Sequence, residues 1–177
     1  MTAEQFELRY SDVPYCELER GEVVRLMAGG WEHSRISYRI ARLLGDWAEQ
    51  SLRGRVLTNE AGLITERDPD TVRGVDVAYF SYERIPVGHE PDGFATVAPE
   101  PAVEVVGKRQ GWGKIVEKAG EYLRMGVERV SIVNPATRTV HVFRPDADPE
   151  RFGESNTLSD PVLLPGFACA VRSFFND

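Results

Sequence analysis

Apolar and polar positions follow a helical period in two stretches of the chain. From Glu32 to Leu52, apolar residues recur every three or four positions while arginines and acids fill the other face. This pattern predicts an amphipathic helix lying on a sheet, ended by Gly54. A second helix is predicted from Gly113 to Gly126, where Gly126 is typical of a C-capping glycine.

Extended patterns surround both helices. Residues 15–19 and 22–27, joined by Arg20-Gly21, are typical of a β-hairpin. Further strands are predicted at residues 55–65, 75–80, 101–106, 128–133, 137–143 and 162–164, with a helical turn at 171–175. Residues 1–14 are either loose or start a short helix, and the long loop 82–100 is either the rim of a site or a plain surface loop. This order predicts an α/β domain with a sheet flanked by at least two helices.

Two of the predicted strands carry a carboxylate inside an apolar run. Asp76 interrupts residues 75–80, and Glu104 interrupts residues 101–106. An unpaired carboxylate in a sheet core costs several kcal/mol or takes up a proton, so each needs a cation, a metal ion or water beside it. If the two strands are neighbours, the alternation of side chains allows both carboxylates to converge within reach of one metal ion.

The second helix offers a basic residue to this pair. Lys118 borders the apolar stripe of that helix, so its ammonium can point at the carboxylates, with Glu60 as a fourth member of the group. Two carboxylates suit Mg²⁺, which takes hard oxygen ligands and keeps several waters. A lysine there would orient an attacking water or stabilise developing charge. A structural interpretation stays open, in which Asp76 caps a turn or pairs with Arg73, and Glu104 pairs with Lys118 and nothing more.

Four other residues are candidates for contacts with a substrate. His33, near the start of the first helix, is either a surface residue or lines the site from above. Lys108, Arg109 and Lys114 form a basic cluster beside the second carboxylate strand, and this cluster either meets a phosphate backbone or is a solvated loop.

Length, composition and net charge limit the classes of protein to which this chain can belong. A length of 177 residues suits a single domain over 1–177, and 42% apolar with 28% charged residues is typical of a soluble globular protein. No apolar run approaches a membrane span, and the two cysteines lack metal-ligand spacing, which favours a reducing cytoplasm. A net charge of −7 argues against a general nucleic-acid coat protein. It does not exclude a nuclease, because metal-binding carboxylates add negative charge.

Several short motifs together resemble the Uma-type putative restriction endonuclease family. They are Tyr15–Val24, Trp31–His33, Thr58–Gly62, Val75–Tyr79, Val103–Val106, Lys118–Val127 and Leu164–Phe167. The family is assigned to the PD-(D/E)XK nuclease-like superfamily. The resemblance therefore implies a restriction-endonuclease-like α/β core, with a central mixed β-sheet flanked by α-helices and an N-terminal β-hairpin. It also implies a divalent-metal site for Mg²⁺ or Mn²⁺, and DNA as partner. It implies that Asp76 and Glu104 are metal ligands, Glu60 a supporting acid and Lys118 the catalytic lysine.

The chain departs from the superfamily pattern after the second carboxylate. Val106 stands where the superfamily usually has its lysine, and the resemblance places that lysine on the following helix. The leading hypothesis is a metal-dependent DNA endonuclease. The alternatives are a catalytically silent nuclease-fold module that binds nucleic acid or a protein partner, and a hydrolase of another phosphate substrate. A homodimer fits an endonuclease, since two sites related by a two-fold axis often cut the two strands of a duplex.

Overall fold

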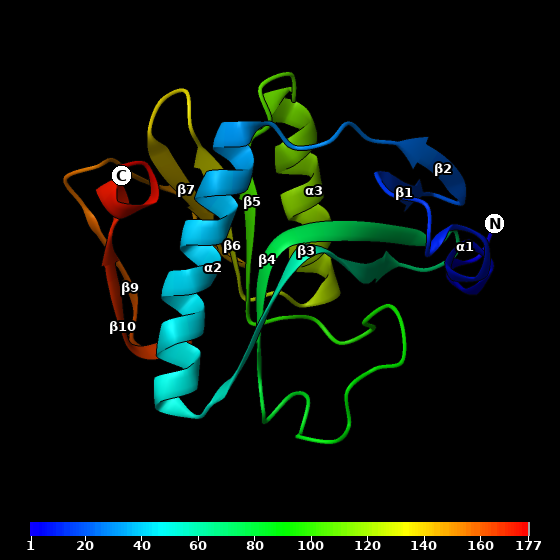
Figure 1. Cartoon of the computed structure of the whole chain (residues 1–177), viewed down its shortest axis with the longest axis horizontal. Coiled ribbons are helices and arrows are strands. Elements are labelled where there is room, and N and C mark those ends of the chain that lie inside the picture. The colour runs from blue at the N-terminus through cyan, green and yellow to red at the C-terminus, as the bar shows by residue number, and fades with distance from the viewer. Residues whose placement is uncertain (177) are drawn as a thin grey trace.

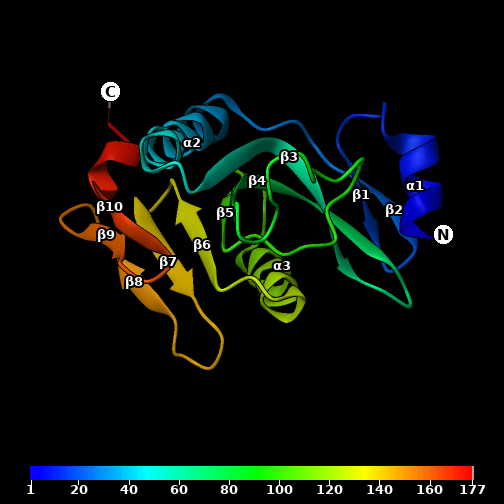
Figure 2. The same ribbon diagram turned by 90° about the horizontal axis from the view of Figure 1, so that it is seen from below.

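The computed structural model describes residues 1–176 and contains a mixed sheet with a long helix on each face (Figures 1 and 2). The eight strands pair in the order β2-β1-β4-β5-β6-β7-β8, and β3 pairs with β4 beside this path. Among the described residues, β5 and β6 are the only neighbouring strands of this sheet that run parallel. The strands are β1 (Cys16–Glu19), β2 (Glu22–Arg25), β3 (Gly54–Glu66), β4 (Thr71–Ser81), β5 (Pro101–Val105), β6 (Arg129–Asn134), β7 (Thr139–Phe143) and β8 (Glu150–Phe152).

The other elements cover the sheet and its end. They are α1 (Ala3–Tyr10), α2 (Trp31–Ser51), α3 (Trp112–Met125), a two-stranded sheet of β9 (Thr157–Asp160) and β10 (Leu164–Ala170), and the 3₁₀ helix η1 (Val171–Phe174). Figure 2 shows α2 and α3 on opposite sides of the sheet, with β10 and η1 beside α2. Each helix buries the apolar stripe expected from its sequence, for example Ile36 and Ile40 in α2 and Ile115 in α3. Full burial of such side chains contributes about 1.5–3 kcal/mol each.

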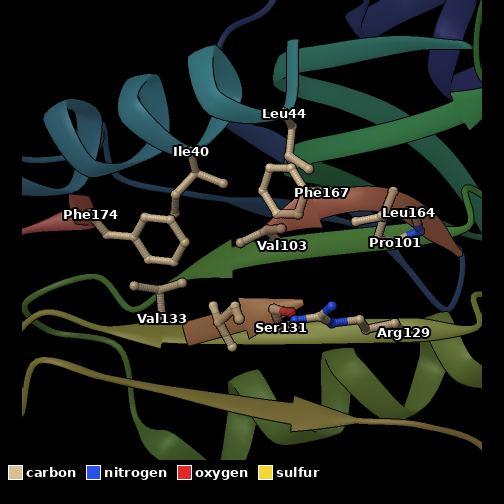
Figure 3. A pocket seen from close by; sticks show the side chains of 11 residues that line it. Ile40, Leu44, Pro101, Val103, Arg129, Ser131, Val133, Leu164, Phe167 and Phe174 are labelled. Atoms are coloured by element: carbon tan, nitrogen blue, oxygen red, sulfur yellow. The ribbon is translucent and has the colours of Figure 1, made fainter. Parts of the chain in front are cut away.

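A small cavity of about 30 Å³ remains between α2 and the sheet (Figure 3). Its walls include Ile40, Leu44, Val103 and Phe174, with Arg129 at one end. Within residues 1–176, Arg129 Nε has no hydrogen-bond partner, and burial lowers the pKa of this guanidinium.

The arrangement of strands around β4 matters most for the site. One edge of β4 pairs with β3 along nearly its whole length. The other edge is shared, because β1 pairs there at Val72 and β5 pairs there at Val77 and Ala78. Residues 73–76 therefore lie between the ends of β1 and β5, without a strand partner on that edge. We call residues 73–76 the open stretch of β4.

Most predicted elements are present, with three corrections. The strand predicted at residues 162–164 is wrong, because Val162 lies 85% exposed in a turn and β10 begins only at Leu164. The first helix ends at Ser51 and is followed by Leu52 in the left-handed conformation, so Gly54 does not end it. Gly54 belongs to β3 instead, where an added Cβ would lie 2.3 Å from Phe80 O. The short strands β8 and β9 were not predicted. Residues 1–14 do contain a helix, α1.

The long loop 82–100 runs along β3, away from the open stretch. Backbone hydrogen bonds join Ala95 to Gly62 and Ile64, so the loop adds a short bridge to the outer edge of β3. No helix within residues 1–176 has the length and apolar character needed to cross a membrane.

Candidate active site

Asp76 lies at the end of the open stretch, where β4 and β5 separate. The last paired residues of the two strands are Val77 and Val103, so Asp76 and Glu104 come next on either side. Asp76 Oδ2 accepts a hydrogen bond from the Val105 N–H group at 2.7 Å, in place of the backbone carbonyl that a longer ladder would supply. The side chain is buried, so this bond fixes the carboxylate between the separating ends of β4 and β5.

Glu104 is the more deeply buried of the two predicted metal ligands, with only 3% of the residue exposed. Its Oε1 accepts from the Tyr122 hydroxyl at 2.7 Å, and its Oε2 lies 3.1 Å from Lys118 Nζ. Burial raises the pKa of Glu104 to about 7, and the negative charge of Asp76 adds to this shift while Lys118 opposes it. Loss of hydration, more than repulsion between charges, therefore disfavours the ionised form of Glu104.

Lys118 reaches back from α3 to the open stretch, as the sequence predicted. Its ammonium donates to Gly74 O at 2.7 Å and lies 3.1 Å from both Glu104 Oε2 and Glu17 Oε1. Burial alone lowers the pKa of Lys118, but the charges of Glu104 and Glu17 outweigh it and raise the pKa. Lys118 is consequently a fixed cation at neutral pH and has no free lone pair with which to take up a proton.

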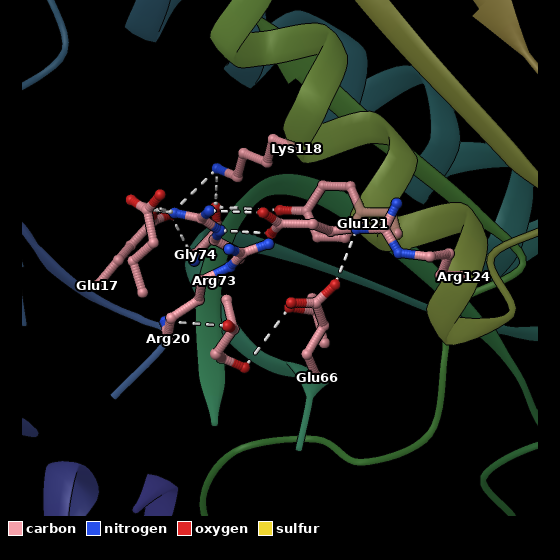
Figure 4. A network of polar contacts seen from close by, with 12 residues as sticks. Glu17, Arg20, Glu66, Arg73, Gly74, Lys118, Glu121 and Arg124 are labelled. Carbon is pink, nitrogen blue, oxygen red and sulfur yellow. Dashed lines mark hydrogen bonds and ion pairs between the residues drawn. The ribbon is translucent and has the colours of Figure 1, made fainter. Parts of the chain in front are cut away.

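A buried ion network next to Lys118 escaped the sequence analysis (Figure 4). Arg73 Nε and NH2 donate to the two oxygens of Glu121 at 2.6 and 2.7 Å, and its NH1 donates to Glu17 Oε2 at 3.0 Å. Arg73 thus pairs with Glu17 and Glu121, and the predicted structural alternative of an Arg73–Asp76 pair is wrong. The network joins β1 and α3 to the open stretch of β4.

Glu60 lies on β3 beside the carboxylates but outside their hydrogen bonds. The β3–β4 register slips between Thr58 and Ala61, and Glu60 has a positive φ of 57° in this bulge. Its side chain is exposed, and partial desolvation together with the charge of Asp76 raises its pKa. Gly74 accommodates the bulge, because an added Cβ would lie 2.8 Å from Glu60 Cβ.

His33 lies beside Asp76, whereas the three predicted basic residues make no contact with the site carboxylates. His33 Nε2 lies 3.2 Å from Asp76 Oδ2, and this hydrogen bond raises the pKa of His33 although burial opposes the shift. Lys108, Arg109 and Lys114 are exposed in the loop after β5 and the first turn of α3. Among the described residues, no hydrogen bond or ion pair engages these three side chains.

The sequence and the fold both match known proteins. The family model Uma2, described as "Putative restriction endonuclease", matches residues 3–172, which is nearly the whole chain. The chain belongs to the Uma2 family. No curated protein matches its sequence. Among solved structures, the crystal structure of a putative nuclease belonging to DUF820 from Anabaena variabilis superposes with a TM-score of 0.81 at 19% identity, covering 99% of this chain and 97% of that one. The predicted family and the restriction-endonuclease-like fold are therefore confirmed.

The Uma2 fold implies a divalent metal, and the carboxylates where β4 and β5 separate are of the type that binds such an ion. Asp76 and Glu104 offer hard oxygen ligands from adjacent strands, and burial together with the charge of Asp76 raises the pKa values of Glu104 and Glu60. Among residues 1–176, no group of three or more His, Cys, Asp or Glu side chains is arranged to hold a metal ion. Two carboxylates suffice for Mg²⁺, which usually fills its remaining positions with waters.

Proposed function

We propose that this Uma2 protein is a metal-dependent DNA endonuclease that hydrolyses phosphodiester bonds. The observation that carries the proposal is the meeting of Asp76, Glu104 and Lys118 at the open stretch of β4, with Lys118 Nζ 3.1 Å from Glu104. Structural ion pairs also occur in sheets, but here the buried carboxylates outnumber the cations beside them. Membership of a putative restriction endonuclease family supports the same conclusion.

Asp76 and Glu104 would hold the ion, Mg²⁺ or Mn²⁺. When bound, such an ion neutralises phosphate charge and lowers the pKa of a water that it binds. Burial and the charge of Asp76 raise the pKa values of Glu60 and Glu104, and a bound cation would favour the ionised forms of both carboxylates. His33 orients Asp76 by occupying its Oδ2 oxygen.

Lys118 would stabilise negative charge on the scissile phosphate. Its carboxylate neighbours keep the ammonium protonated, so it acts as a cation and hydrogen-bond donor, not as a general base. The exposed Lys108, Arg109 and Lys114 would contact the DNA backbone further along the duplex.

Nicking of supercoiled DNA with Mg²⁺ or Mn²⁺ tests this function. Wild type is compared with Asp76→Asn, Lys118→Met and the control Asp92→Asn, which alters an exposed carboxylate in the loop 82–100. We expect both site variants to lose activity by at least about 100-fold, since removal of one stabilising donor commonly costs that much. Asp92→Asn should cleave like wild type.

Two results would contradict the proposal. Equal cleavage by all four proteins would indicate a contaminating nuclease. Absence of cleavage by wild type, with metal binding retained in calorimetry, would support the catalytically silent module instead.

A further inference from the structure

The open stretch of β4 is completed by side chains in place of a strand. The Gly74 N–H group donates to Glu17 Oε1 at 2.9 Å, and the Gly74 carbonyl accepts from Lys118 Nζ at 2.7 Å. Buried backbone groups need such partners, and a neighbouring strand normally supplies them. Here a carboxylate from β1 and an ammonium from α3 do so together.

The same two side chains also contact each other. Glu17 Oε1 lies 3.1 Å from Lys118 Nζ, which closes a triangle with Gly74 (Figure 4). The ammonium has three hydrogens, and it finds three acceptors in Gly74 O, Glu17 and Glu104. Every direction in which Lys118 can donate is therefore defined. A free lysine side chain carries about 2 kcal/mol of rotamer entropy, so this restraint is substantial.

Glu17 is itself held rigidly. Only 5% of the residue is exposed, and its second oxygen accepts from Arg73 NH1 at 3.0 Å. Arg73 is fixed in turn by its two hydrogen bonds to Glu121, which lies three residues after Lys118 on α3. The carboxylate that faces Lys118 consequently has no freedom to follow a displaced lysine.

We propose that Glu17 is a positioning residue that fixes the ammonium of Lys118 beside the carboxylate pair. The proposal rests on the proposed nuclease function, in which Lys118 meets the phosphate. Without Glu17, Lys118 keeps Glu104 and Gly74 as acceptors but loses the third acceptor, which helps to fix the position of its ammonium. Glu17 lies in the N-terminal hairpin, so the hairpin would belong to the active site as well as to the fold.

Lysine reactivity tests the positional role without any activity. The chain has three lysines, and the exposed Lys108 and Lys114 act as internal references for Lys118, whose side chain is 13% exposed. The protein is pulse-labelled with an amine-acylating reagent, and modification is read by mass spectrometry. In Glu17→Ala we expect labelling of Lys118, relative to Lys114, to rise at least about tenfold as the ammonium gains freedom.

Glu19→Ala is the matched control. Glu19 lies two residues further on β1 and contacts Arg73 at 3.4 Å, but it makes no contact with Lys118 among the described residues. Labelling of Lys118 should stay at the wild-type level. If Glu17→Ala fails to fold by circular dichroism, Glu17→Gln keeps the shape of the side chain and should raise labelling several-fold.

Kinetics then separate positioning from stability. Glu17→Gln should lower kcat at least about tenfold with KM and metal affinity within twofold of wild type, because Lys118 acts on the reacting phosphate. Unchanged labelling of Lys118 in every folded Glu17 variant would overturn the inference. Raised labelling of Lys118 in the Glu17 variants, together with an inactive wild-type protein, would refute the nuclease proposal and leave the positional role of Glu17 supported.

Discussion

Tyr122 links the core of α3 to the carboxylate of Glu104. Its ring is fully buried against the sheet, and its hydroxyl donates to Glu104 Oε1 at 2.7 Å. Burial raises the pKa of Tyr122 well above its usual value, and the charge of Glu104 adds to the shift, so the phenol remains a donor. A donor that cannot ionise holds a buried carboxylate in place at any physiological pH.

Tyr122→Phe should therefore reduce the free energy of unfolding by about 2 kcal/mol, the usual scale for a hydrogen bond to a charged group. Urea denaturation at pH 7 measures the loss. The control is Tyr79→Phe, because Tyr79 is equally buried while its hydroxyl makes no hydrogen bond within residues 1–176. Equal losses in the two variants would show that removal of a buried hydroxyl, and not loss of the hydrogen bond to Glu104, accounts for the effect.

Some residues of the candidate site can be predicted from the sequence, and others cannot. Asp76 and Glu104 stand out because each interrupts an apolar run, and Lys118 stands out at the edge of a helical stripe. Glu17 gives no such signal. In Cys16-Glu17-Leu18-Glu19 it alternates like any solvent-facing residue of a hairpin, and its burial depends on where β1 meets β4. A long-range pairing of this kind is not encoded in local periodicity.

At the scale of elements, α1 is tied to the β3–β4 turn by one carboxylate. Asp70 Oδ2 accepts from the Ala3 N–H group at 2.7 Å and lies 2.9 Å from Arg67 NH1. Burial opposes ionisation of Asp70, but the backbone hydrogen bonds and Arg67 outweigh it and lower the pKa. The ionised form is thus favoured by the folded state.

This lowered pKa predicts acid-sensitive docking of α1. The contribution of Asp70 to stability is complete above its ordinary pKa of 3.8 and is lost as the pH falls through the lower folded value. Asp70→Asn should unfold at a lower urea concentration than wild type at pH 7, and the difference should shrink as the pH falls below 3.8. Hydrogen exchange of the α1 amides locates the effect. A difference that stays constant as the pH falls would contradict it.

The strands of the central sheet were easier to predict than those at its end. Runs rich in Val mark β4, β5 and β6, and these strands are buried on both faces. In β9 only Leu158 and Asp160 are buried, so a single apolar position gives no recognisable alternation. The apolar Val162-Leu163-Leu164 was misleading, because Val162 points into solvent at the turn before β10.

At the scale of the whole molecule, the net charge of −7 opposes binding to DNA. Under the proposed function, a local cluster must overcome this repulsion, and the exposed Lys108, Arg109 and Lys114 follow directly after the Glu104 strand. Each phosphate contact contributes about 0.9 to the slope of log affinity against log salt concentration.

The triple variant Lys108→Gln, Arg109→Gln, Lys114→Gln should weaken DNA binding and lower that slope by about 2.7 if all three residues contact phosphates. Fluorescence anisotropy between 50 and 200 mM salt, roughly the range in which such contacts dominate, measures both quantities. The control triple Arg9→Gln, Arg53→Gln, Arg151→Gln removes the same charge from exposed positions elsewhere. Equal effects of the two triples would mean that only net charge matters.

The side chains around the open stretch come from β1, α2, β4, β5 and α3, so they span the chain from Glu17 to Tyr122. During synthesis, a chain still growing on the ribosome has the two strand carboxylates before it has Lys118. Under the proposed function, such a fragment lacks the cation that meets the phosphate. A cell making this protein is therefore exposed to an active nuclease only once α3 has emerged and packed against the first hairpin.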